Sequence, residues 1–256
     1  MAVLRARALS KRFSGVAVVR DVDFTVEPGE IVGYLGPNGS GKTTTIRMLA
    51  GLIEPSSGRV EFDDRDVGDD LIAFRRRLGY IPEEPFLYPF LSGREYLELI
   101  GRLRELPDAL MQDKITRFLD LFGILGAADQ SIASYSKGMR QKVLISAALL
   151  HDPEIVILDE PNSGLDVTTT LVLRSLVQAL ASEGRMIIYS SHLLEAVERA
   201  ASDVLILHEG RVVAHDSVDR LRGLMELPSL EQVFRRLVIE TDIDGVARDL
   251  VSTMRR

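Results

Sequence analysis

Residues 31–51 read IVGYLGPNGSGKTTTIRMLAG, and this stretch decides the fold. It begins with a short apolar run, residues 31–35, which stops at a glycine-rich segment. The residues that follow, 44–50, have the character of a helix, and Gly51 is its expected stop. The stretch therefore predicts a strand, a loop and a helix in that order.

The glycine-rich segment, residues 36–43, reads GPNGSGKT and fits the phosphate-loop pattern, with the required strand before it and helix after it. Its glycines let successive backbone N–H groups point at a phosphate, where the helix N-terminus adds its positive end. Lys42 can reach the β and γ oxygens of a nucleotide, and the Thr43 hydroxyl can bind Mg²⁺. The nucleotide-binding residues that we expect here are Asn38, Gly39, Ser40, Gly41, Lys42, Thr43 and Thr44.

Three further runs, at 155–158, 186–189 and 204–207, are apolar at every position, as in parallel strands that are buried on both faces. Shorter patterns at 16–26 and 58–62 indicate antiparallel strands that edge this main sheet. The sequence therefore predicts an α/β fold.

The middle of the chain, about residues 90–150, carries no strand pattern. Ser92 to Glu95 has the spacing of a capping box, and apolar residues then recur at helical intervals. We expect an α-helical subdomain inserted between two parts of the core. A second capping box at Ser229 to Gln232 predicts a small C-terminal helical extension over residues 216–256.

Two carboxylates, Asp159 and Glu160, follow the apolar run at 155–158 directly. One acid at a strand tip can hold Mg²⁺ through water, and a second beside it can polarise a water for attack on a γ-phosphate. An Asp-Glu pair after a strand is common on its own. Together with the phosphate loop, it predicts nucleotide hydrolysis.

Composition excludes several classes of protein. The chain has 256 residues, of which 46% are apolar and 27% charged, so it is not a collagenous or disordered chain. Its net charge of −7 argues against a general nucleic-acid partner, and the absence of cysteine excludes disulfides. The first 13 residues carry charges through their apolar stretch, so we expect no signal peptide. The apolar run at 143–150 is too short for a bilayer, which needs about 20 residues.

Several motifs together resemble those of the ATP-binding cassette (ABC) ATPases. Residues 136–141, SKGMRQ, resemble the signature motif of that family, and residues 161–166, PNSGLD, resemble its D-loop. His192 lies where the family has its switch histidine, and Phe13 where it has an aromatic residue that stacks on adenine. The resemblance covers about residues 3–215, and it looks most like bacterial exporter ATPases of the drug-resistance type.

The resemblance implies a fold and a set of roles. The fold is a P-loop NTPase core, with a RecA-like, mostly parallel sheet and an antiparallel β edge, plus the helical subdomain; residues 1–215 form the ATPase domain. The family acts as a head-to-tail dimer, so Ser136 and Gly138 would face the partner's γ-phosphate. Glu160 would be the catalytic base and His192 a γ-phosphate contact. Asp159 and Thr43 would hold Mg²⁺.

Two departures from the usual family pattern leave alternatives open. Glu83 lies where most members have a glutamine that touches Mg²⁺, and Glu84 could take that place instead. Lys137 replaces a glycine of the common signature, so it either adds a cation near the phosphates or points to solvent.

The function that the resemblance implies is the ATP-hydrolysing subunit of a transporter, which forms a homodimer or heterodimer around two MgATP. It would lie in the cytoplasm, on the inner face of the membrane, and power a separate transmembrane permease. The alternative is a soluble ABC ATPase in DNA repair, translation or cofactor assembly. Neither the long coiled-coil insertion of the repair type nor the tandem cassettes of the translation type is present. A GTPase would need an Asn-Lys-x-Asp motif, which we do not find.

Overall fold

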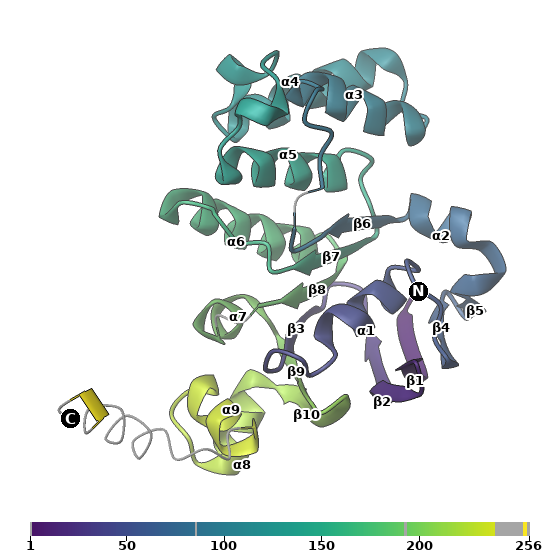
Figure 1. Ribbon diagram of the computed structural model, residues 1–256, viewed down its shortest axis with the longest axis vertical. Helices are drawn as coiled ribbons and strands as arrows, with labels where there is room; N and C mark the ends of the chain where they lie inside the picture. The colour runs from purple at the N-terminus through teal and green to yellow at the C-terminus, as the bar shows by residue number, and fades with distance from the viewer. Residues whose placement is uncertain (1, 85, 192–193, 239–252, 255–256) are drawn as a thin grey trace.

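A mostly parallel sheet forms the centre of the molecule (Figure 1). The computed structural model describes residues 2–84, 86–191, 194–238 and 253–254. Within these residues the strand order is β10-β9-β3-β8-β7-β6, and β10 alone pairs antiparallel. The strands are β3 Ile31–Leu35, β6 Leu78–Ile81, β7 Ile155–Asp159, β8 Met186–Ser190, β9 Asp203–His208 and β10 Arg211–Ser217. The predicted α/β fold with a mostly parallel central sheet is confirmed.

The register of the central strands brings the candidate loops together. Asp159, the last residue of β7, pairs with Ser190, the last residue of β8. Tyr34 of β3 pairs with Ser190 from the other side. Because the carboxyl ends of parallel strands meet at one edge, the loops after β3, β7 and β8 all open there.

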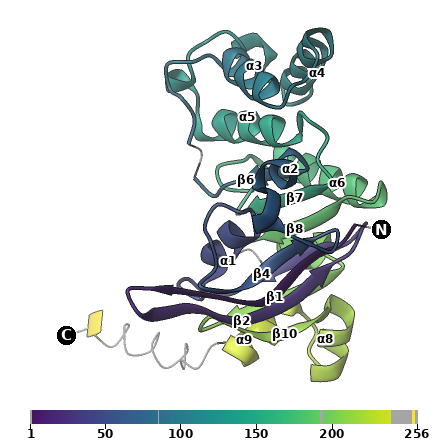
Figure 2. The same cartoon turned by 90° about the vertical axis from the view of Figure 1, so that its right-hand side faces the viewer.

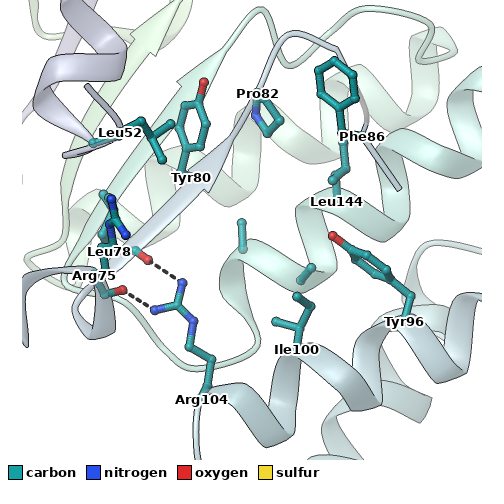
Figure 3. A pocket seen from close by; sticks show the side chains of 13 residues that line it. Leu52, Arg75, Leu78, Tyr80, Pro82, Phe86, Tyr96, Ile100, Arg104 and Leu144 are labelled. Carbon is teal, nitrogen blue, oxygen red and sulfur yellow. Dashed lines mark hydrogen bonds between the residues drawn. The ribbon is translucent and has the colours of Figure 1, made fainter. Parts of the chain in front are cut away.

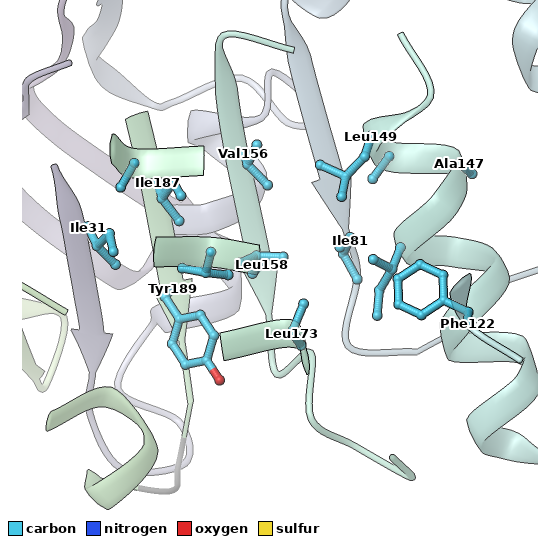
Figure 4. Close-up of a cluster of buried hydrophobic side chains, with 14 of the residues drawn as sticks. Ile31, Ile81, Phe122, Ala147, Leu149, Val156, Leu158, Leu173, Ile187 and Tyr189 are labelled. Atoms are coloured by element: carbon cyan, nitrogen blue, oxygen red, sulfur yellow. The ribbon is translucent and has the colours of Figure 1, made fainter. Parts of the chain in front are cut away.

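Alternate residues of the central strands point to opposite faces, which gives the molecule two hydrophobic clusters. On one face, Val156, Leu158 and Ile187 point toward Leu173 of α6 (Val167–Ser182), as Figure 4 shows. On the other face, the intervening Ile155, Ile157 and Ile188 join a cluster with α1 (Lys42–Leu49). Each central strand is therefore buried on both sides, which explains its uninterrupted apolar sequence.

The N-terminal strands form a second sheet instead of edging the first, which corrects our expectation (Figure 2). Its order is β2-β1-β4-β5, all antiparallel. Its strands are β1 Leu4–Phe13, β2 Val16–Val26, β4 Ser57–Phe62 and β5 Arg65–Asp66. The physical reason is that these strands bury only one side: Leu4, Val22 and Phe24 join the cluster around α1, while their sequence neighbours are largely exposed.

The predicted helical subdomain consists of α3 (Gly93–Leu103), α4 (Asp108–Leu121) and α5 (Lys137–Leu149), drawn in blue to teal in Figure 1. The capping box at the start of α3 is present, because Ser92 accepts from the Glu95 N–H and Glu95 accepts from the Ser92 N–H. The short elements around the subdomain are η1 Val67–Asp70, α2 Leu71–Arg76, η2 Leu125–Ala127 and η3 Ile132–Ser134.

The C-terminal helices share the main core. They are α7 (Leu194–Ala200), α8 (Val218–Met225) and α9 (Leu230–Val238), and Leu230 and Val233 are fully buried in the cluster that covers one face of the central sheet. Of the helices in the described ranges, none combines the length and the apolar character that crossing a membrane requires.

His151 joins the end of α5 to β6. Its Nε2 lies 3.0 Å from the Leu78 carbonyl oxygen, which can only accept, so the neutral ring donates from Nε2. Within the described residues, its buried Nδ1 has no partner. Burial lowers the pKa of His151 to about 4, and the nearby charge of Arg104 acts in the same direction. His151 is therefore neutral in the folded protein at neutral pH.

We expect His151 to make the fold sensitive to acid. As pH falls from 6.5 to about 4, the unfolded chain protonates this histidine while the folded chain does not, so the free energy of unfolding decreases across that window. His151→Gln keeps a donor for Leu78 and cannot titrate. Urea unfolding between pH 7.5 and 4.5 should show a shallower decline for the variant, by about 1 kcal/mol per pH unit. If the free energy of unfolding changed with pH equally in both proteins, His151 would not be the cause. The other histidines are present in both proteins, so their contributions cancel.

Candidate functional site

In the loop between β3 and α1, Gly36 and Gly41 lie so close to other parts of the backbone that a side chain at either position would displace its neighbours. A Cβ on Gly36 would lie 2.4 Å from the Leu207 carbonyl oxygen, and one on Gly41 would lie 2.7 Å from that of Val18. Gly41 also has φ +101°, which L residues rarely adopt. No side chain caps α1, so its first backbone N–H groups are available to an anion.

Lys42 folds back over this loop. Its ammonium donates to the carbonyl oxygens of Gly36 at 2.6 Å and Pro37 at 3.1 Å. Burial lowers the pKa of Lys42, while the carboxylates of Glu160, Asp159 and Glu83 oppose that shift. The Lys42 ammonium is therefore held by two carbonyl oxygens of the loop and interacts electrostatically with three carboxylates.

The two carboxylates at the end of β7, Asp159 and Glu160, are both buried. Asp159 is 1% exposed, and its Oδ2 has no hydrogen-bond partner in the described part of the chain. Burial raises the pKa of Asp159 to about 6, and the charges of Glu83 and Glu160 add to that rise. Glu160 has φ +49°, and its Oε2 accepts from the Ser191 hydroxyl at 3.4 Å. A non-glycine residue in this region is strained, which is typical of functional positions.

A hollow of about 200 Å³ gathers most of the predicted residues. It is lined by Val18, Asn38, Gly39, Gly41, Lys42, Thr43, Thr44, Glu83, Asp159 and Glu160. Glu83 lines the hollow and Glu84 does not, so the geometry favours Glu83 for the uncertain position. Val18 of β2 is the lining residue that sequence reasoning missed, because an aliphatic residue in a strand carries no chemical signal.

The remaining predicted residues lie outside this hollow. Phe13 is the last residue of β1 and is 47% exposed, and the Lys11 ammonium lies 5.3 Å from the centre of its ring. Ser136 and Gly138 lie at the start of α5, where the Ser136 hydroxyl accepts from the Met139 N–H at 3.2 Å. Ser40 lies within the phosphate loop, where it is 3% exposed, but it does not line the hollow. His192 lies outside the described residues.

The site suits a metal ion whose ligands come partly from the protein and partly from a nucleotide. Within the described ranges, no three His, Cys, Asp or Glu side chains are grouped as they would be around a protein-only metal site. Mg²⁺ commonly takes one or two carboxylates and completes its shell with phosphate oxygens and water. The buried, unpartnered Oδ2 of Asp159 and the nearby Thr43 fit such a shared arrangement.

Comparison with known proteins agrees with this geometry. The ABC transporter family matches residues 19–163. The ABC transporter ATP-binding protein NatA of Bacillus subtilis is 37% identical over 230 residues, which cover 88% of this chain and 94% of NatA. The Nod factor export ATP-binding protein I of Cupriavidus metallidurans is 33% identical, over 85% of this chain and 73% of that protein.

A solved structure of an ATP-binding subunit of an ABC transporter superposes with a TM-score of 0.87 at 34% identity, covering 92% of this chain and 99% of the other. The family match spans more than half of the chain and includes the phosphate loop and both carboxylates. The chain therefore belongs to the ABC transporter family, and it is an ATPase of that family.

Proposed function

We propose that the chain closes with a second ABC ATPase, identical or not, around two MgATP, and that hydrolysis drives a separate transmembrane protein. One observation supports the dimer: Ser136, which caps α5, and Gly138, in its first turn, do not line the hollow that the phosphate loop borders. A signature segment from a second chain is therefore free to complete each site. The N-terminus of α5 would offer its N–H groups to the partner's γ-phosphate.

The hollow supplies complementary roles for the triphosphate. Lys42 and the loop N–H groups would bind the phosphates, and the adenine would lie outside the hollow, over Phe13. Thr43, Asp159 and Glu83 would hold Mg²⁺, directly or through water, and the bound Mg²⁺ would offset charge on the phosphate oxygens. This assignment is supported by the unpartnered Oδ2 of Asp159.

Glu160 is the proposed general base. It lies directly after the Mg²⁺ candidate Asp159 and lines the same hollow, where a water could attack the γ-phosphate in line. The attacking water would give its proton to the Glu160 carboxylate as the bond to phosphorus forms and the bond to the β-phosphate oxygen breaks. His192 is proposed to contact the γ-phosphate, on the sequence motif alone.

A groove between the core and the helical subdomain is the proposed dock for the transmembrane partner (Figure 3). Its volume is about 260 Å³, and its walls are largely apolar, with Leu52 and Tyr80 on the core side and Tyr96 and Ile100 on α3. At its rim, the Phe86 ring is 78% exposed. Large exposed aromatic surface beside a groove is typical of a protein contact.

The groove also adjoins the nucleotide site. Tyr80 and Pro82 line the groove, while Glu83, the next residue, lines the hollow. The rings of Tyr88 and Phe90 stack on each other, with 6.0 Å between their centroids, yet the two residues are 53% and 77% exposed. A segment seated in the groove would therefore contact the same stretch of chain that carries a proposed Mg²⁺ ligand.

Glu160→Gln should bind MgATP and hydrolyse it about 10²- to 10⁴-fold more slowly, because the amide keeps the shape and cannot accept the proton. With ATP the variant should elute from gel filtration as a larger species than the nucleotide-free wild type. Glu84→Gln, which removes a neighbouring charge outside the hollow, should keep the wild-type rate. A Glu160→Gln protein that hydrolyses ATP normally and stays monomeric would place the base elsewhere.

Phe86→Ser should weaken the contact with the membrane partner and leave ATP hydrolysis by the isolated chain intact, because Phe86 lines the groove and not the hollow. The matched control is Leu224→Ser on α8, which removes a side chain that is 71% exposed and remote from the groove. Tagged chains purified from detergent-solubilised membranes should carry a spanning protein with the wild type and the control, and lose it with Phe86→Ser. Equal recovery with all three would remove the groove from the interface.

A further inference from the structure

The start of α5 interlocks with the segment that follows Glu160. This segment, residues 161–166, connects β7 to α6, and Gly164 lies near its middle. A Cβ on Gly138 would lie 2.8 Å from the Gly164 carbonyl oxygen, and a Cβ on Gly164 would lie 2.7 Å from Cγ of Lys137. The backbone of Gly164 therefore leaves no room for a side chain at position 138, and the aliphatic stem of Lys137 covers Gly164.

Side chains of α5 hold the same segment at further points. The Lys137 ammonium donates to the Ser163 hydroxyl at 2.7 Å. One turn later, the buried Gln141 donates from Nε2 to the Pro161 carbonyl oxygen at 3.1 Å. Lysine and glutamine at positions i and i+4 lie on one helical face, so this face of α5 runs along the segment.

Ser163 connects Lys137 to the proposed base. Its backbone N–H donates to the Glu160 carbonyl oxygen at 3.2 Å, while its hydroxyl accepts from Lys137. Glu160 itself has the strained φ of +49°, a conformation that persists only when its surroundings fix it. A tether on Ser163 therefore acts on the backbone that aims the Glu160 carboxylate.

We infer that Lys137 is a positioning residue for hydrolysis, which acts through Ser163 on Glu160 of its own chain. This inference rests on the proposed role of Glu160 as the base. It gives a function to the lysine that replaces the usual signature glycine: the ammonium ties the first turn of α5 to residues 161–166, so the signature and the base of one chain move together. Lys137 is exposed, as one of our two sequence interpretations has it, but its ammonium is bound to Ser163 and not to solvent alone.

A mutant cycle between Lys137 and Ser163 tests the inference. Lys137→Met keeps the stem and removes the donor, and Ser163→Ala removes the acceptor. Each should lower kcat about five-fold, the effect of a hydrogen bond of ordinary strength, with the half-saturating MgATP concentration and the melting temperature unchanged. The double variant should be no slower than either single variant, and Lys137→Arg, which keeps a donor, should restore most of the rate.

Three results would overturn the inference. If the effects of Lys137→Met and Ser163→Ala on kcat multiply, the two residues act independently. If Lys137→Met raises the half-saturating MgATP concentration whether or not Ser163 is present, the lysine acts on the partner's phosphate directly. An unchanged kcat in Lys137→Met would remove any role. A second pair of variants separates this test from the proposed role of Glu160: Lys137→Met should have no further effect on kcat in a Glu160→Gln background. If Glu160→Gln alone hydrolyses normally, the assignment of the base has failed, while the Lys137–Ser163 cycle still measures their coupling.

Discussion

Concentrated negative charge in one small hollow is the constraint on which the rest of the site depends. Glu83, Asp159 and Glu160 line it together, and among the described residues that line it Lys42 is the one cation. Burial raises the pKa of Asp159 to about 6 and lowers the pKa of Lys42. The environment of each group therefore disfavours its charged form. The proposed MgATP resolves both conflicts, because Mg²⁺ faces the carboxylates and the phosphates face Lys42. Binding of the ligand thereby becomes a large change in local electrostatics, which a transporter can convert into motion.

The fold concentrates this charge through the order of its strands. β3, β7 and β8 end at one edge of a sheet that is buried on both faces, so the loops after them have little freedom to separate. The helical subdomain is attached beyond β6, and α5 returns the signature to the segment after β7. Contacts within one chain therefore connect the proposed partner groove to the hollow, and the hollow to the signature.

Features of the fold and the site that depend on neighbouring residues could be predicted from the sequence. Features that depend on contacts between distant residues could not. The strand, loop and helix of residues 31–51 and the Ser92 capping box need only neighbouring residues, so they were predicted correctly. The separate N-terminal sheet was not predicted, because alternating apolar residues show that one face of a strand is buried but do not show which element packs against it. The sequence could not decide whether Lys137 points to solvent or lies near the phosphates, because its hydrogen-bond acceptor, Ser163, is 26 residues away along the chain. Glu83 and Glu84 are adjacent and chemically alike, and only the course of the backbone distinguishes them.

The most direct test of the central claim is the free energy of unfolding of Asp159→Asn without nucleotide. Because the pKa of Asp159 is raised from 3.8 to about 6 on folding, its protonated form stabilises the folded chain at low pH, and this contribution is lost as pH rises through about 6. At pH 8 the wild type therefore holds an unfavourable buried charge. Urea unfolding at pH 8 should find the variant more stable by about 2 kcal/mol, with the difference shrinking toward pH 5. Adding MgATP should stabilise the wild type far more than the variant. An Asp159→Asn protein that is no more stable than the wild type at pH 8 would show that the carboxylates are not in conflict, and would contradict the account.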